Sequence, residues 1–132
     1  MTKISGIDHL VLTVADIGAT RDFYRNVLGM DFREFTGADQ SRRAALHFGN
    51  CKINLHLKNH EFDPKAQKPT PGSADLCLLT RESLETWSAH LAEQNIPRIL
   101  GPVPRSGALG PINSIYIRDP DGNLIEISCY DR

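Results

Sequence analysis

The chain runs twice through one order of secondary structure, and this repeat restricts its fold more than any other feature. An aliphatic strand pattern at 8–14 precedes a helical pattern at 17–28, and three further strand patterns follow. The same order returns with a strand pattern at 74–80, a helical pattern at 81–96 and three more strand patterns. Because a single β-α-β-β-β run buries only one face of its sheet, the repeat predicts two matching modules in an α+β fold.

A polar, proline-bearing connector separates the two runs. We expect one domain over 1–132, with a first βαβββ module at 4–58, a linker at 59–73 and a second βαβββ module at 74–130. The prolines and glycine of the connector argue against helix or strand there, so it is read as a linker or a lid.

Composition excludes several classes of function. The 15 basic and 16 acidic residues give a formal net charge of -1, and no long basic run indicates a nucleic-acid or membrane-surface partner. Three widely spaced cysteines favour a reducing compartment over a disulfide framework. No apolar run approaches the roughly 20 residues of a membrane helix, and the N-terminus lacks a signal-peptide pattern. We therefore expect a soluble cytoplasmic protein.

Polar residues interrupt otherwise aliphatic strands at corresponding places in the two modules. His9 lies in the first strand, and Asp75 falls at the same place in the fifth. Glu126 lies between isoleucines in the last strand, and Asn54 and His56 share one face of the fourth. A buried carboxylate is costly unless it is paired or bound to metal, so these residues are candidates for one polar site.

Two interpretations of these residues remain open from the pattern alone. Imidazole nitrogen with carboxylate oxygen suits a divalent ion such as Zn²⁺, Ni²⁺, Fe²⁺, Co²⁺ or Mn²⁺. The alternative is a set of hydrogen-bonded polar residues at strand ends or in a metal-free pocket. The long gaps between the residues do not decide between the two.

Two stretches carry a resemblance to a known family: "DHLVLTVADIGATRDFYRNVLGM" in the first module and "RDPDGNLIEIS" in the second. The chain resembles the vicinal oxygen chelate superfamily, which includes glyoxalase I, extradiol dioxygenases, and fosfomycin- and bleomycin-resistance proteins. The stretch "GPVPRSGALGPINSIYIRDPDGNLIEIS" is similar to a narrower group of small lactoylglutathione-lyase-like, virulence-associated proteins. The resemblance implies paired modules that form a half-open mixed-sheet barrel around a metal cavity, commonly in a homodimer.

The resemblance also implies roles for individual residues. His9 matches the first-strand histidine ligand of the family, and Glu126 matches its last-strand glutamate ligand. Asp75 stands where the family usually has a second histidine, and Asn54 stands where glyoxalase I has another glutamate. His56 is the next residue on that face. The predicted metal ligands are His9, His56, Asp75 and Glu126, and Glu126 and His56 are the predicted catalytic residues.

Three residues are predicted to bind substrate: Asn54, Cys77 and Arg105. Cys77 is expected to share the cavity face with Asp75. Arg105 lies in a Gly/Pro-rich stretch that is read as a loop before the seventh strand, where its guanidinium could clamp a carboxylate or phosphate. The alternative for Arg105 is a solvated loop side chain.

The expected function is that of a glyoxalase-like enzyme of lyase or isomerase type. The resemblance implies a divalent Ni, Zn, Mn or Fe ion that acts as a Lewis acid on a small substrate with vicinal oxygens. Asn54 cannot act as the base that glutamate provides in glyoxalase I. The alternatives are a metal-free binding and sequestration protein of the bleomycin-resistance type, or an extradiol-type dioxygenase that holds Fe²⁺ through His9, His56 and Glu126.

Overall fold

The computed structural model describes residues 1–130, which divide into two compact units. Met1–Pro71 form the first unit, and the second unit begins at Gly72. Each contains one helix and one four-stranded mixed sheet, and the two are described separately.

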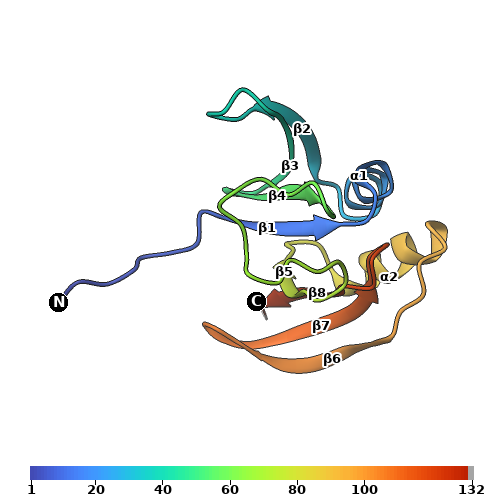
Figure 1. The fold of residues 1–132 in the computed structure, drawn as a ribbon. Helices are drawn as coiled ribbons and strands as arrows, with labels where there is room; N and C mark the ends of the chain where they lie inside the picture. The colour runs from blue at the N-terminus through green and yellow to red at the C-terminus, as the bar shows by residue number, and fades with distance from the viewer. Residues whose placement is uncertain (131–132) are drawn as a thin grey trace. The chain divides into compact units, whose positions relative to one another are not determined.

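The first unit has the order strand, helix, strand, strand, strand. Its sheet runs β1-β4-β3-β2, with β1 parallel to β4 and the other neighbours antiparallel. Residues 1–8 lead into β1 as an exposed arm (Figure 1). The elements are β1 (His9–Val14), α1 (Ile17–Asn26), β2 (Asp31–Thr36), β3 (Arg42–Phe48) and β4 (Cys51–Leu57).

The second unit repeats this arrangement strand for strand. Its sheet runs β5-β8-β7-β6, with β5 parallel to β8 and the remaining pairs antiparallel. The prediction of two βαβββ modules in an α+β fold is therefore confirmed. The elements are β5 (Asp75–Leu79), α2 (Leu84–Glu93), β6 (Leu100–Gly107), β7 (Gly110–Arg118) and β8 (Leu124–Tyr130).

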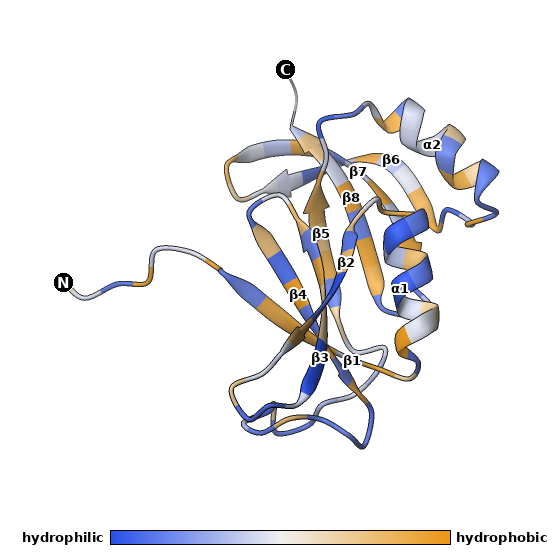
Figure 2. Ribbon diagram, turned by 90° about the horizontal axis from the view of Figure 1, so that it is seen from above, coloured by the Kyte–Doolittle hydropathy of each residue, from blue (hydrophilic) through white to orange (hydrophobic). Residues whose placement is uncertain are grey.

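Each sheet has one apolar face and one more polar face, because side chains alternate along a strand. Figure 2 shows this alternation along β4. In the first unit, Leu12, Leu46 and Ile53 lie on one buried face of the sheet. Phe23 and Tyr24 of α1 are buried as well and belong to the core. The opposite face carries the predicted site residues, so the helices lie on the side of the sheet away from the site.

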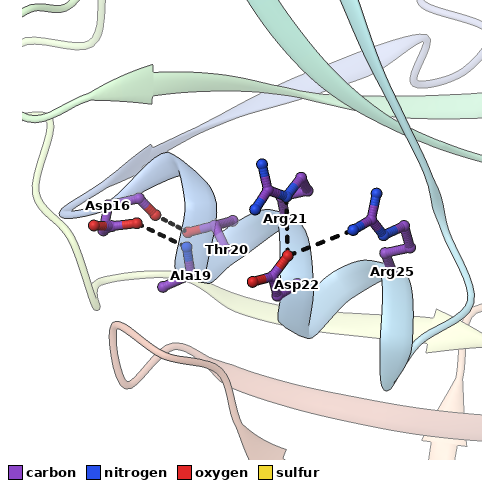
Figure 3. A network of polar contacts seen from close by, with 6 residues as sticks. All are labelled: Asp16, Ala19, Thr20, Arg21, Asp22 and Arg25. Atoms are coloured by element: carbon purple, nitrogen blue, oxygen red, sulfur yellow. Dashed lines mark hydrogen bonds and ion pairs between the residues drawn. The ribbon is translucent and has the colours of Figure 1, made fainter.

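Local capping fixes the ends of the helices. Asp16 is the N-cap of α1: its Oδ1 accepts from the Ala19 amide at 2.7 Å, while its carbonyl accepts from the Thr20 hydroxyl (Figure 3). Gly29 follows α1 with φ +72°, and Asn95 follows α2 with φ +58°. Both residues adopt the left-handed conformation that ends a helix. No helix within residues 1–130 is long and apolar enough to cross a membrane.

The predicted loop around Arg105 is wrong, because this residue lies in strand β6 and pairs with Ile112 of β7. β6 is an edge strand, so Pro102 and Pro104 can occupy it without breaking the ladder on both sides. The prolines suggested a loop, but the turn itself lies between Gly107 and Gly110, which pair directly.

Candidate active site

In the second unit, strand register brings Asp75, Cys77 and Glu126 onto one face. Cys77 of β5 is paired with Glu126 of β8, and Asp75 lies two residues earlier on β5. Two residues of strand and one strand spacing separate the α-carbons of Asp75 and Glu126 by roughly 8 Å. Asp75 and Glu126 are therefore diagonal neighbours in the sheet.

The first unit shows the same register with other side chains. Val11 of β1 is paired with Asn54 of β4, and His9 lies two residues before Val11. His9 and Asn54 thus occupy in the first unit the positions that Asp75 and Glu126 occupy in the second. The two modules each present one diagonal pair of potential ligands on the face away from the helix.

His56 does not belong to this pair. It is paired with Thr13, which lies four residues beyond His9 along β1. Four residues of strand correspond to about 13 Å. The structure brings His9 close to Asn54, while His56 lies at the other end of the same face.

The His9 ring is oriented by its neighbour Asp8. The Nδ1 atom of His9 lies 2.8 Å from Oδ1 of Asp8, and this hydrogen bond lowers the pKa of the Asp8 carboxyl. An ionised carboxylate can only accept, so Nδ1 donates and Nε2 carries the lone pair of the neutral ring. Metal-binding histidines are commonly held in this way by a carboxylate on the second nitrogen.

Asn54 contributes a buried oxygen that has no hydrogen-bond partner. Its Oδ1 is one of the buried unsatisfied polar atoms within residues 1–130. Such an atom is costly to bury, and a cation or a polar ligand group beside it would remove that cost. Together with the imidazole of His9, this oxygen is a donor that fits a borderline divalent ion.

His56 is buried and held in the neutral form. Its side chain is 7% exposed, and its ring meets the Phe62 ring edge-on at 5.5 Å between centroids. The Arg43 guanidinium lies 4.1 Å from the centroid of the same Phe62 ring. Burial, followed by the positive charge of Arg43, lowers the pKa of His56, with Glu61 opposing the shift. A neutral imidazole in this position can accept a proton.

Glu126 is held by buried hydroxyl groups. Its Oε2 lies 2.6 Å from the Ser114 hydroxyl and 3.3 Å from that of Ser128, and the two hydroxyls lie 2.7 Å apart. The thiol of Cys77 lies 3.3 Å from the Ser128 hydroxyl. The cluster therefore joins a carboxylate, two hydroxyls and a thiol across three neighbouring strands.

A cavity of about 280 Å³ opens on this face of the second unit. Glu126 and Cys77 line it together with apolar groups and the β6–β7 turn. Partial burial raises the pKa of the Cys77 thiol, as do the nearby carboxylates of Glu126 and Asp75, whereas the Ser128 hydroxyl lowers it. The lining residues are Cys77, Leu79, Ser106, Gly107, Ala108, Ile112, Glu126 and Tyr130.

Arg105 lies next to this cavity but is not among its lining residues. Its Nε donates to the Tyr116 hydroxyl at 2.9 Å, and its Nη1 donates to the carbonyl of Pro104. Tyr116 is paired with Glu126 in the sheet. The guanidinium is exposed, so it remains available to an anionic group that approaches this face.

Among residues 1–130, no three His, Cys, Asp or Glu side chains converge closely enough to hold a metal ion. Within each unit, the predicted donors occur as the diagonal pairs described above. Ser114 was not predicted as a site residue. The signal for it is a serine at 114 that lies on the same face of β7 as Ile112 and Tyr116, the face that also carries Glu126.

The profile of the Glyoxalase/Bleomycin resistance protein/Dioxygenase superfamily matches residues 6–127. The chain belongs to this superfamily. It is 54% identical over 127 residues to the virulence protein STM3117 of Salmonella typhimurium, covering 96% of this chain and 85% of the relative. It is 51% identical to the glyoxalase domain-containing protein RDO1 of Mycosarcoma maydis, covering 97% of this chain and 70% of that protein.

The superfamily match extends to solved structures and to more distant relatives. A structure from the mobile metagenome of V. Pseudocholerae has a TM-score of 0.94 at 52% identity, and the match covers 100% of this chain and 99% of that one. The metallothiol transferase FosB of Bacillus licheniformis is 29% identical, over 98% of this chain and 80% of the relative. The superfamily thus includes a relative whose name denotes metal-dependent chemistry.

Proposed function

We propose that the chain is a metal-dependent enzyme of the glyoxalase type, with lyase or isomerase chemistry on a small substrate that carries vicinal oxygens. The observation that carries the proposal is the environment of the Glu126 carboxylate. Its carboxylate lines a cavity, shares a face with Asp75 and is fixed by buried hydroxyls. A carboxylate held in this way is suited to bind a cation or to exchange a proton with a substrate.

We propose Asp75 and Glu126 as metal ligands in the second unit and, separately, His9 as a metal ligand in the first. Support comes from their equivalent register positions and from the Asp8 carboxylate on His9. The unsatisfied Oδ1 of Asn54 is a further donor at the fourth equivalent position. When bound, a divalent ion such as Ni²⁺, Zn²⁺, Mn²⁺ or Fe²⁺ would supply Lewis-acid polarisation of substrate oxygens.

We assign His56 to proton transfer rather than to the ion. It lies about 13 Å along the strands from His9, and its buried ring is neutral at neutral pH. In this proposal, His56 accepts a proton from the substrate, the role that Asn54 cannot fill. In the second unit, we propose that Cys77 and the walls of its cavity contact a small molecule and that Arg105 binds an anionic group on it.

A homodimer in the cytoplasm is part of the proposal. Ile4 is 91% exposed and Ile7 is 77% exposed on the arm before β1, which favours a partner surface over solvent. Cys51, Cys77 and Cys129 are free thiols, which favours a reducing compartment. Size-exclusion chromatography with light scattering would test the dimer, and cell fractionation would test the location.

Metal analysis of protein purified without chelators tests the proposed function. The expected result is a stoichiometric divalent ion, or activity that appears when Ni²⁺, Zn²⁺, Mn²⁺ or Fe²⁺ is added. Protein that neither contains nor binds any of these ions would instead be a metal-free binding protein of the bleomycin-resistance type. Oxygen uptake with catechols would replace the lyase or isomerase assignment with extradiol-type dioxygenase chemistry.

A further inference from the structure

We propose that Ser114 is a positioning residue that holds Oε2 of Glu126, with Ser128 behind it, so that Oε1 faces the cavity. This inference rests on the proposed function, because it gives Glu126 a ligand or base role. The Ser114 and Ser128 hydroxyls lie 2.6 Å and 3.3 Å from the same carboxylate oxygen, Oε2. Neither of these contacts is made to Oε1.

The sheet register builds this arrangement. Ser114 of β7 and Ser128 of β8 are directly paired, and Glu126 lies two residues from Ser128 on the same face of β8. Both serines are 0% exposed. The hydroxyls therefore lie beneath the carboxylate in the sheet and do not exchange freely with water.

The direction of the hydrogen bonds follows from the number of protons. An ionised Glu126 carboxylate can only accept, so Ser114 donates its single hydroxyl proton across the 2.6 Å contact. The 2.7 Å contact between the hydroxyls must then be donated by Ser128, and the Cys77 thiol donates to Ser128. The series of hydrogen bonds from Cys77 through Ser128 to Ser114 thus runs toward Glu126. The shortest contact is that between Ser114 and Glu126.

The backbone holds Ser114 in place from the neighbouring strand. A Cβ at Gly101 of β6 would collide with the carbonyl oxygen of Ser114, so the two backbones approach closely. Gly101 has φ +106°, a conformation that favours glycine. This close packing fixes the position of the β7 backbone at Ser114.

The two serines differ in a way that an experiment can use. Ser114→Ala removes the 2.6 Å bond and leaves Glu126 only the 3.3 Å contact with Ser128. Ser128→Ala keeps the Ser114 bond and leaves the Cys77 thiol without its hydroxyl partner. Ser114→Cys keeps nearly the same shape with a weaker donor. The Kd for the metal ion is expected to rise most in Ser114→Ala. Ser114→Cys and Ser128→Ala are each expected to raise it less.

Calorimetric titration of the full chain with NiCl₂ and with MnCl₂ tests the proposal. We expect Ser114→Ala to raise the Kd for the ion about 10- to 100-fold, the usual effect of removing an outer partner of a ligand. Thr20→Val is the matched control, because it deletes a buried hydroxyl from α1. It is expected to lower stability without changing the Kd.

Infrared spectra of the metal-free protein separate failure of this inference from failure of the proposed function. The carboxylate bands of Glu126 are assigned by their loss in Glu126→Gln, and they are expected to shift in Ser114→Ala. A shift in a protein that binds no ion would support positioning and sink the metal proposal. An unshifted band with an unchanged Kd in Ser114→Ala would overturn the positioning role. If Ser114→Ala does not fold, Ser114→Cys gives the same two readouts.

Discussion

At the scale of single residues, the environment of each side chain sets its chemistry. His56 is buried against Phe62 and near Arg43, whereas His9 is exposed and hydrogen-bonded to Asp8. The first environment disfavours the charged ring, and the second fixes which nitrogen carries the lone pair. Two histidines on one face of the sheet are therefore suited to different tasks.

Acidification is expected to destabilise the metal-free protein through His56. The pKa of His56 in the folded protein lies below its ordinary value of about 6.5, so the unfolded chain binds more protons as pH falls through that value. The free energy of unfolding should fall from pH 7.5 toward pH 5, as measured by urea denaturation. His47 also has a lowered pKa and contributes part of this slope.

The variant His56→Gln separates the contribution of His56 from that of His47. Its stability should depend less steeply on pH than that of the wild type, because one group that charges on unfolding is gone. An identical slope in the two proteins would show that the pKa of His56 is the same in the folded and unfolded states.

Some of these residues stand out in the sequence, and others do not. Glu126 and Asp75 were found because a charged residue interrupts an apolar strand at an equivalent place in each module. Ser114 gave no such contrast, because a serine is common on both buried and exposed strand faces. Its role depends on being paired with Ser128, which is a matter of register between two strands.

At the scale of elements, capping residues decide where the helices begin and end. Asp16 caps α1 and Ser83 caps α2, each accepting from an amide three residues later. The sequence predicts the first of these caps because an Asp precedes the apolar helical pattern. The strand β6 was misjudged because its prolines indicate a loop unless the strand lies at a sheet edge.

Removing either cap should cost about 1 kcal/mol of stability. Asp16→Ala and Ser83→Ala each leave an amide of the first turn without its partner. Asp22→Ala is the control, because Asp22 is exposed and caps no amide of the first turn; it pairs with Arg21 and Arg25 (Figure 3). Urea denaturation should give a change within about 0.5 kcal/mol for the control. Equal losses in all three variants would contradict the capping role.

Gly101→Ala should disturb the contact between β6 and β7. The new methyl group would collide with the Ser114 carbonyl, and the positive φ alone costs about 1–2 kcal/mol for a residue with a side chain. Thermal unfolding should show a clear loss of stability. Gly29→Ala is the comparison, because it has a positive φ and open space around it, so it should lose less. Equal losses would show that the collision is relieved without cost.

At the scale of the whole molecule, one architecture occurs twice with different side chains. The strand orders β1-β4-β3-β2 and β5-β8-β7-β6 are the same, which the repeated sequence pattern predicts. The positions of His9 and Asn54 in one unit match those of Asp75 and Glu126 in the other. The repeat could be predicted because hydrophobic periodicity is local, whereas the difference between His9 and His56 required the pairing of β1 with β4.

The central claim is that Glu126 binds a divalent ion and His56 does not, and one comparison of metal affinities tests it. NiCl₂ is titrated into the wild type, Glu126→Gln and His56→Gln, and binding is measured by calorimetry. We expect the wild type to bind the ion, Glu126→Gln to lose at least about tenfold in affinity, and His56→Gln to keep nearly unchanged affinity. Binding that survives in Glu126→Gln and disappears in His56→Gln would contradict it.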